Sequence, residues 1–382
     1  MSAATVGVAL IVKDEAATLP RVLDSIAAAV DEIVVVDTGS TDATVQVARR
    51  YTDRVFPFPW IDDFAAARQF AFDQVQSDWV FWLDADDVVL SAAQIRSQIH
   101  AAPATVAGYL WPYIVGRDAH GHSTCQFWRE RCVRNDGRFR WAGRVHEVLR
   151  GPREALLVRD DTIRVEHQPQ DKGVRDPRRN LRLLEQELAA NPDRPEPRLL
   201  YYLGREYADV GEYEQAIALL TRYLTVATWQ DEAYLAETQL AALYRLGGDY
   251  GQALAADHRA RQRCPQWPQA YFGLAESHYY LHEWQQVADW CDMGRRQPPP
   301  QTDHFVNPMA YRFDWLIYYT VSLYHLGRRR EALAWTKVAL RICPDDPWHC
   351  RNLHVFLRSS AATRDEPFLK STEMAPNGHT TA

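Results

Sequence analysis

The chain has 382 residues, and its 43 Lys and Arg against 50 Asp and Glu give a formal net charge of −7. This length accommodates two domains, and the acidic balance excludes a broad basic field that would collect nucleic acid. No apolar run is long enough to span a membrane. Met1 leads almost at once into an apolar run, so no signal peptide is expected. The six cysteines lack Cys-x-x-Cys spacing and are expected to be reduced thiols. We therefore expect a cytoplasmic protein.

The first part of the chain alternates apolar runs with amphipathic segments. The pattern predicts strands at 6–12, 33–36, 55–58 and 79–83, and helices at 19–26, 43–51 and 64–76. Strands that alternate with helices at this spacing predict parallel β-α-β units in a doubly wound α/β sheet. Polar tips follow the first, second and fourth predicted strands, at the sheet edge where such folds bind ligands. A nucleotide-sized site is therefore expected there.

The most informative segment is the apolar run 79–83, which is followed by the carboxylates Asp84, Asp86 and Asp87. Carboxylates are costly to bury unpaired, so the cluster is expected where the strand emerges from the core. Carboxylate oxygens at that position suit Mg²⁺ or Mn²⁺, shared with a substrate diphosphate. The alternative is an ordinary acidic turn, and the repeated polar tips upstream argue against it.

The motifs over residues 1–170 resemble those of GT-A-fold, family 2 glycosyltransferases, in the same order and spacing. The segments that carry the resemblance are 12–15 (Val-Lys-Asp-Glu), 34–42 (Val-Val-Val-Asp-Thr-Gly-Ser-Thr-Asp), 63–68 (Asp-Phe-Ala-Ala-Ala-Arg) and 83–87 (Leu-Asp-Ala-Asp-Asp). The sequence departs from the family at Gln69 and at Lys13-Asp14, positions where Asn is common. The resemblance implies a Rossmann-like GT-A catalytic domain, a UDP- or GDP-linked sugar as donor, and Mn²⁺ or Mg²⁺.

The resemblance also implies roles for single residues. Asp37 would accept hydrogen bonds from the nucleotide base, Glu15 would contact the ribose or base, and Asp84 would lie near the ribose. Arg68 would hold the acidic cluster or the diphosphate, since a guanidinium suits planar anions, and Asp86 would be the direct metal ligand. The complete set implied for the nucleotide sugar is Val12, Asp14, Glu15, Asp37, Arg68, Asp84, Ala85 and Trp141.

A second constellation occupies residues 139–147 and resembles the acceptor-side loop of GT-A enzymes. By that analogy Glu147 is the catalytic base, which takes a proton from a hydroxyl or thiol, and His146 positions it. The alternative is an exposed His-Glu pair on a strand. His167 ends the alternating run 162–167 and, by the same resemblance, would complete the metal site. The alternative for His167 is an ordinary surface histidine.

The chain becomes helical and repetitive over residues 176–358. Gly211-Glu212-Tyr213 recurs as Gly248-Asp249-Tyr250, His282-Glu283-Trp284 and Gly327-Arg328-Arg329. This pattern resembles tetratricopeptide repeats, in which stacked helix pairs share one core, so the aromatic and leucine stripes are read as packing residues. The stack would offer a surface for an extended peptide. The alternative is that it stiffens the enzyme or forms a homodimer. Residues 361–382 are expected to be a disordered tail.

A family 2 domain followed by such repeats resembles bacterial peptide glycosyltransferases of the sublancin type. That resemblance implies metal-dependent, inverting transfer of a sugar to Cys or Ser/Thr of a peptide or protein. Two alternatives stay open. One is transfer to a saccharide, lipid or small molecule in cell-surface or natural-product biosynthesis, and the other is a non-catalytic peptide-binding scaffold.

Overall fold

The structure is a computed structural model that describes residues 3–169, 176, 178–300 and 302–361, with side chains to residue 358. Its contacts divide the chain into two units: residues 1–192 with 302–306, and residues 193–301 with 307–382. The predicted boundary between 170 and 176 falls largely outside the described residues, and so does the predicted tail beyond residue 361. Within the described residues, no helix is both long and apolar enough to cross a membrane.

The first unit is built on a mixed sheet. Among the described residues, nine strands follow the order β3-β2-β1-β4-β7-β6-β11-β5 with β10 beside β6, and β8 and β9 form a separate ladder. The strands are β1 (Val6–Val12), β2 (Glu32–Asp37), β3 (Val55–Pro57), β4 (Trp79–Leu83), β5 (Asp87–Leu90), β6 (Val106–Arg117), β7 (Ser123–Arg134), β8 (Arg140–Ala142), β9 (Val148–Arg150), β10 (Leu156–Arg159) and β11 (Arg164–His167).

The parallel part of the sheet follows the sequence prediction. Strands β1 to β4 lie within one residue of their predicted bounds, and β1 pairs in parallel with both β2 and β4. The predicted helix at 43–51 is shorter in the structure, because Arg50 and Tyr51 bond to carbonyls three residues back and close it as a tight turn. The sequence did not predict that the sheet continues beyond β4 through antiparallel β7 and the long hairpin β6–β7.

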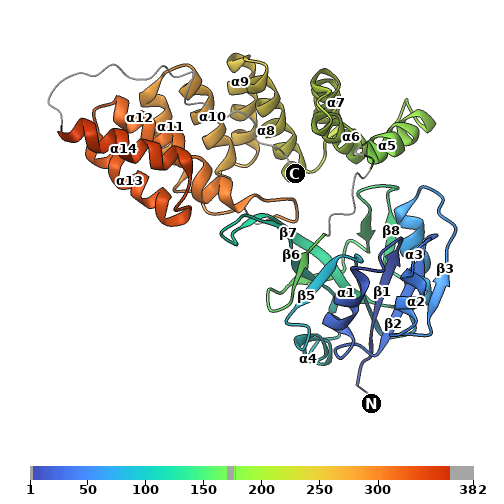
Figure 1. Cartoon of the computed structure of the whole chain (residues 1–382). Coiled ribbons are helices and arrows are strands. Elements are labelled where there is room, and N and C mark those ends of the chain that lie inside the picture. Colours follow the sequence, from blue (N-terminus) through green and yellow to red (C-terminus); the bar gives the residue numbers. More distant parts are fainter. Residues whose placement is uncertain (1–2, 170–175, 177, 301, 362–382) are drawn as a thin grey trace. The chain divides into compact units, whose positions relative to one another are not determined.

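Helices cover both faces of the parallel strands, as a doubly wound sheet requires (Figure 1). On one face, Val8, Leu10 and their neighbours pack with α1, α2 and α4. On the other face, Ala9, Val34 and Val36 pack with α3 and with the β8–β9 ladder. The helices of this unit are α1 (Leu19–Ile26), α2 (Thr44–Ala48), α3 (Phe64–Gln74), α4 (Gln94–His100) and α5 (Arg179–Ala190).

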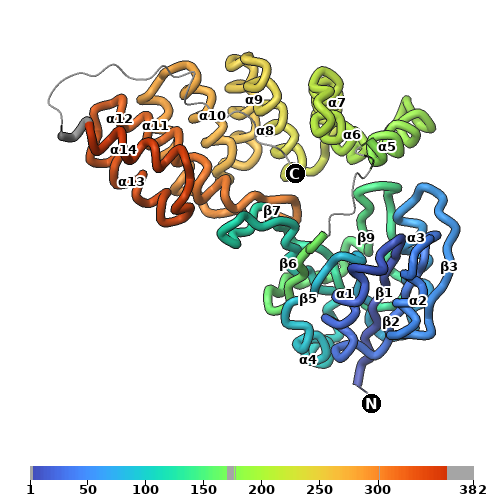
Figure 2. The backbone as a smooth tube through the Cα atoms, viewed as in Figure 1, coloured from blue at the N-terminus to red at the C-terminus, as the bar shows by residue number. Residues whose placement is uncertain are grey.

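Residues 302–306 belong to the first unit although they follow most of the helical repeats in sequence. Gln126 of β7 and Val306 exchange two backbone hydrogen bonds of 2.9 Å. Beside this bridge, the rings of Phe127 and Phe305 lie 4.4 Å apart. We call residues 302–306 the clasp; Figure 2 shows it in orange beside the teal β7.

The second unit consists of helical hairpins, and each of its first eight helices packs most extensively within its own hairpin. Its elements are α6 (Pro197–Asp209), α7 (Tyr213–Val226), α8 (Gln230–Leu246), α9 (Tyr250–Arg263), α10 (Gln269–Tyr280), α11 (Trp284–Gly294), a π-helical turn (Ala310–Asp314), α12 (Leu316–His325), α13 (Arg329–Ile342) and α14 (Pro347–Ala361).

The four sequence repeats mark the four hairpin turns. Gly211, Gly248 and Gly327 have φ of 81°, 77° and 75°, and His282 takes the same left-handed conformation with φ of 60°. In each turn the next residue donates its N–H to a carbonyl five residues back, as in a Schellman motif. The small residue that follows each turn is fully buried; these residues are Ala216, Ala253, Val287 and Ala332. The prediction of tetratricopeptide-like repeats is confirmed.

Candidate active site

The carboxyl ends of β2, β1 and β4 meet at one edge of the sheet. Asp37, the last residue of β2, pairs in register with Val12 of β1. Asp84 directly follows β4, and Ala85 is buried beside it. Because β2 and β4 flank β1, the chain turns to opposite sides of β1 at this point, and ligands of open α/β sheets bind at such switch points. The structure thus brings Asp37, which was predicted to bind the nucleotide base, and Asp84, which was predicted to lie near the ribose, to one edge of the sheet.

The loops after β1 and β2 are joined by hydrogen bonds. Asp14, at φ of 53°, accepts from the backbone N–H of Thr41 at 2.7 Å and donates its own N–H to the hydroxyl of Ser40 at 2.9 Å. The N–H of Glu15 donates to the hydroxyl of Thr44 at 2.7 Å. The carboxylate of Asp14 therefore holds the loop pair together in this structure, although the sequence analysis assigned it to the nucleotide.

Arg68 of α3 joins two carboxylates that come from different parts of the chain. Its Nη2 lies 2.5 Å from Oδ1 of Asp84, and its Nε donates to Oε1 of Glu147 at 2.6 Å. The guanidinium carbon also lies 4.5 Å from the centre of the Trp82 ring and 5.2 Å from that of Trp141. Arg68 is only 6% exposed. One buried cation thus connects the predicted donor-side carboxylate with the predicted base.

The ion pair between Asp84 and Arg68 shifts the pKa of both groups. Burial alone would raise the pKa of Asp84, but the charges of Arg68 and Arg131 outweigh it and lower the pKa to about 2. Burial alone would lower the pKa of Arg68, and the carboxylates of Asp84 and Glu147 raise it above its ordinary value instead. Asp84 and Arg68 are therefore both charged at neutral pH.

Glu147 is presented by a tight loop between β8 and β9. Gly143 and His146 both have left-handed backbones, with φ of 97° and 52°. Such a conformation is unusual for a residue other than glycine and reverses the chain sharply. Glu147 is 9% exposed and precedes β9, so it is not part of an exposed pair on a strand.

Two hydrogen bonds attach this loop to α3. The N–H of Trp141 donates to Oε1 of Gln69 at 3.1 Å, and the N–H of Phe64 donates to the carbonyl of Arg144 at 3.0 Å. Gln69, noted above as a departure from the family, has this structural role. Since α3 carries Arg68, the same helix positions both the guanidinium of Arg68 and the loop that presents Glu147.

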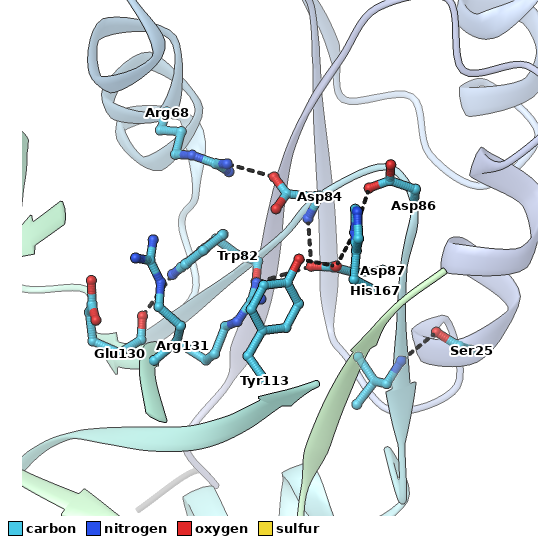
Figure 3. A network of polar contacts seen from close by, with 12 residues as sticks. Ser25, Arg68, Trp82, Asp84, Asp86, Asp87, Tyr113, Glu130, Arg131 and His167 are labelled. Carbon is cyan, nitrogen blue, oxygen red and sulfur yellow. Dashed lines mark hydrogen bonds and ion pairs between the residues drawn. The ribbon is translucent and has the colours of Figure 1, made fainter. Parts of the chain in front are cut away.

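The strand register brings His167 to the acidic cluster. In the antiparallel pair β11–β5, His167 lies opposite Asp87. Its Nδ1 is 3.3 Å from Oδ1 of Asp86 and 3.5 Å from Oδ1 of Asp87 (Figure 3). Burial alone would lower the pKa of His167, but the two carboxylates outweigh it and raise the pKa to about 10.

The donor set of this cluster fits a divalent cation. One ligand atom from each of Asp86, Asp87 and His167 lies within 4.8 Å of the others. Nδ1 of His167 is buried and has no hydrogen bond of suitable geometry. Two carboxylates and an imidazole are donors that Mn²⁺ or Mg²⁺ accepts. The predicted pair Asp86 and His167 is thus brought together, and Asp87 lies beside the pair.

Arg131 and Tyr113 both contact Asp87, and neither residue was predicted to belong to the site. Nη1 of Arg131 donates to Oδ2 of Asp87 at 3.1 Å, and the hydroxyl of Tyr113 donates to Oδ1 at 2.9 Å. Arg131 could have been found from the sequence, because it comes directly before the apolar pair Cys132-Val133. A charged side chain in a buried strand needs a partner of opposite charge.

The fold and the site define an α/β domain with carboxylates at the ends of its parallel strands, followed by helical repeats. Residues 8–148 match the family described as Glycosyl transferase family 2. The first unit therefore contains a family 2 glycosyltransferase domain, and the repeats after it are tetratricopeptide-like.

Curated relatives match different parts of the chain. A TPR repeat-containing protein of Synechococcus elongatus is 42% identical over 98 residues, which are 25% of this chain and 24% of that protein. The SPbeta prophage-derived glycosyltransferase SunS of Bacillus subtilis is 26% identical over 230 residues, 57% of this chain and 53% of SunS. The lipopolysaccharide core biosynthesis glycosyltransferase LpsC of Rhizobium meliloti is 30% identical over 128 residues, 31% of this chain and 47% of LpsC. The chain spans about half or less of the length of these relatives.

Proposed function

We propose that the protein is a metal-dependent, inverting glycosyltransferase that acts in the cytoplasm. It moves a sugar from a UDP- or GDP-linked donor to a Cys or Ser/Thr side chain of a peptide or protein. The observation that carries this proposal is the bridge by Arg68 between Asp84 and Glu147, 2.5 and 2.6 Å long, beside the pair Asp86 and His167. A donor-side carboxylate, Asp84, and an acceptor-side carboxylate, Glu147, would then share the buried guanidinium of Arg68.

The nucleotide lies, in this proposal, along the ends of β2, β1 and β4. Asp37 accepts hydrogen bonds from the base, while Val12 and the backbone around Asp14 and Glu15 line the site. Asp84 and Ala85 approach the ribose. The joined loops after β1 and β2 support this assignment, because a site held rigid before binding loses less entropy when the nucleotide binds.

Asp86 and His167 hold Mn²⁺ or Mg²⁺ in the proposed site. When bound there, the cation would supply positive charge that stabilises the departing nucleoside diphosphate. Arg68 orients Asp84, two residues before Asp86, through an ion pair of 2.5 Å. This arrangement keeps three carboxylates close together with the help of one guanidinium on each flank, Arg68 for Asp84 and Arg131 for Asp87.

Glu147 acts as the general base. It takes the proton of the acceptor hydroxyl or thiol while that atom attacks the anomeric carbon, and the leaving group departs on the opposite face. His146 sets the backbone turn that presents Glu147, and Trp141 packs on Arg68, the partner of the base. The buried ion pair with Arg68 keeps the Glu147 carboxylate oriented between turnovers.

A peptide or protein acceptor is favoured by the helical repeats that come after the catalytic unit. Helical-hairpin repeats form extended surfaces that bind other chains. The similarity to SunS covers 57% of this chain, whereas the family match spans only residues 8–148, so the similarity to SunS reaches beyond the matched domain. The resemblance to sublancin-type peptide glycosyltransferases rests on this combination of parts.

The test is a donor screen followed by an acceptor screen with the full chain. Purified protein is incubated with UDP- and GDP-sugars, with Mn²⁺ or with chelator, and nucleoside diphosphate release is measured. We expect release from one donor class that stops on chelation. Peptides with a single Cys or Ser are then added, and the mass increase of one hexose or related sugar is measured.

The matched control uses both ends of the same strand. Asp86→Asn removes a proposed ligand after β4, whereas Asp78→Asn changes a carboxylate before β4 that binds Thr5. We expect Asp86→Asn to abolish release and Asp78→Asn to retain it. Equal activity of the two variants, or full wild-type activity in excess chelator, contradicts the metal-dependent mechanism.

A saccharide or lipid acceptor is the second candidate, and the similarity to LpsC, a glycosyltransferase named for lipopolysaccharide core biosynthesis, favours it. The acceptor screen separates the two. If no peptide is modified while an added saccharide is extended, the saccharide acceptor replaces the peptide in the proposal.

A further inference from the structure

The three carboxylates after β4 differ in how much solvent they can reach. The side chain of Asp84 is 32% exposed, that of Asp86 is 7% exposed, and that of Asp87 is fully buried. A fully buried carboxylate is costly unless each of its oxygens has partners. The surroundings of Asp87 therefore decide what it can do in the site.

Both oxygens of Asp87 already accept hydrogen bonds from the protein. Oδ1 accepts from the Tyr113 hydroxyl at 2.9 Å, and Oδ2 accepts from Nη1 of Arg131 at 3.1 Å and from the backbone N–H of Asp84 at 3.0 Å (Figure 3). A cation that bound directly to Asp87 would have to displace one of these donors. It would also lie close to the positive charge of Arg131.

Arg131 cannot easily move aside. Its side chain is fully buried, and its guanidinium carbon lies 3.9 Å from the centre of the Trp82 ring and 4.1 Å from that of Tyr113. Nη1 also lies 3.3 Å from the carbonyl oxygen of Trp82. Two aromatic rings, and a carbonyl of the strand that precedes the acidic cluster, thus hold the guanidinium of Arg131 in place.

Asp87 also faces the imidazole of His167. The pairing of β11 with β5 sets the two residues opposite each other, and Nδ1 of His167 is 3.5 Å from Oδ1 of Asp87. The Tyr113 ring lies edge-on to the same imidazole, with ring centroids 6.2 Å apart. The orientation of the imidazole therefore depends on a carboxylate that Arg131 and Tyr113 hold still.

We propose that Asp87 is a positioning residue for the cation site formed by Asp86 and His167, and not itself a ligand, with Arg131 and Tyr113 as its supports. The inference rests on the proposed function for the identity of that site. Changes in the outer partners of metal ligands typically cost 10- to 100-fold in metal affinity. A group that acts only by positioning is expected to show an effect of that size, without abolishing binding.

The first measurement is Mn²⁺ binding by the full chain without donor, followed through the electron paramagnetic resonance of free Mn²⁺. We expect the wild-type protein to bind and Asp86→Asn to lose binding. Tyr113→Phe removes only the hydroxyl that donates to Asp87 and keeps the ring against Arg131. We expect it to bind Mn²⁺ about 10-fold more weakly than the wild type, and Asp87→Asn to bind at least as weakly while retaining measurable affinity.

Tyr109→Phe is the matched control. Tyr109 is buried on the same face of β6, four residues before Tyr113, and packs on Trp79 with ring centroids 5.8 Å apart. This substitution also removes one tyrosine hydroxyl from β6, at a position away from the acidic cluster. We expect Mn²⁺ affinity equal to that of the wild type, with thermal stability recorded for both tyrosine variants.

The second measurement needs no metal. Two-dimensional NMR of the His167 ring nitrogens, at one fixed pH in the metal-free protein, reports the environment of the imidazole. We expect the His167 signals to shift in Tyr113→Phe and to stay in place in Tyr109→Phe. A purely structural weakening of the fold would lower stability in both variants without this selective shift.

The outcomes separate the positioning role from the proposed function. If the wild type binds Mn²⁺ no better than Asp86→Asn, the proposed cation site fails, and the His167 signals alone decide whether Asp87 orients the ring. If Tyr113→Phe leaves both Mn²⁺ affinity and the His167 signals unchanged, the positioning role is overturned. It is also overturned if Asp87→Asn abolishes Mn²⁺ binding as fully as Asp86→Asn while Tyr113→Phe binds normally, because Asp87 is then a ligand.

Discussion

Arg68 and Glu147 are 79 residues apart in the chain, and in the folded protein Nε of one lies 2.6 Å from Oε1 of the other. The contact joins the helix after β3 to the loop before β9, and Arg68 continues from there to Asp84. The proposed base thus depends on a residue from the donor half of the site. A substitution of Arg68 therefore affects both Asp84 and Glu147.

Removing the charge of Arg68 should destabilise the first unit. Arg68→Met leaves Asp84 and Glu147 without their common cation, and breaking a buried pair in this way typically costs about 3–5 kcal/mol. Arg68→Lys keeps the charge but cannot span two carboxylates, so we expect an intermediate loss. The measurement is the free energy of unfolding in urea.

Arg140→Met serves as the control, since Arg140 makes an exposed pair with Asp73 at 3.2 Å. Exposed pairs contribute at most about 1 kcal/mol. Equal losses in Arg68→Met and Arg140→Met would show that the bridge adds no stability.

Glu147→Gln should separate binding from transfer. The amide oxygen of Gln still accepts from Nε of Arg68, so the loop and the donor site are retained while the basicity is lost. General bases typically contribute about 100- to 10,000-fold, and we expect transfer to fall by at least the lower figure with donor affinity unchanged. Glu130→Gln is the control, because within the described residues the Glu130 carboxylate accepts only from the N–H of Leu149. A near wild-type transfer rate for Glu147→Gln would exclude it as the base.

Two adjacent glycines at the end of α8 should respond in opposite directions to alanine. Gly248 has φ of 77° and open space where a Cβ would lie, so Gly248→Ala introduces backbone strain and no clash. We expect a loss of about 1 kcal/mol. Gly247 has a helical backbone at φ of −79°, and its added Cβ makes ordinary contacts, so Gly247→Ala should stabilise by about 0.4–1 kcal/mol. Thermal unfolding of both variants checks the signs, and a stabilising Gly248→Ala would contradict the left-handed turn.

Asp346 should make the stability of the last helix depend on pH. It precedes α14, and its Oδ2 accepts from the backbone N–H of His349 at 2.9 Å and lies 2.7 Å from Nδ1 of the same residue. Burial alone would raise the pKa of Asp346, but these bonds outweigh it and lower the pKa below its ordinary value. The stabilisation is therefore complete above the unfolded pKa of about 4 and is lost as the pH falls through the lower folded pKa.

The corresponding experiment compares thermal unfolding of the wild type and Asp346→Ala between pH 3 and pH 7. At neutral pH we expect alanine to cost about 1 kcal/mol, with the difference shrinking at the acidic end. Asp346→Asn is the control, because it caps the helix without titrating. A difference between wild type and alanine that stays constant down to pH 3 would show that the ionised carboxylate is not the cap.

The sequence predicted what depends on local pattern. Strands β1 and β4 and the four repeat turns were located within a residue, because an apolar run or a Gly at a helix end specifies them locally. At the third turn, His282 was located by the repeat alone, since nothing local predicts a left-handed histidine. The acidic cluster was expected at a strand end for the same kind of local reason.

The parts that were not predicted depend on pairing between distant segments. Arg131 reaches Asp87 only because antiparallel β7 inserts between β4 and β6, and no local pattern in 123–134 specifies that neighbour. His167 was expected at the metal site from a family resemblance, and the structural reason, its register opposite Asp87 in the β11–β5 pair, was not visible in the sequence.

The clasp makes the catalytic unit discontinuous in sequence. A protein cut after Pro192 would lack residues 302–306, leave the backbone of Gln126 without its bridge to Val306 and uncover the ring of Phe127. Poor solubility or activity of such a fragment would then reflect a missing piece of its own sheet and would say nothing about what the repeats bind. Because the clasp lies between the two sequence segments of the helical unit, one continuous deletion of residues 193–361 also removes part of the unit that precedes it.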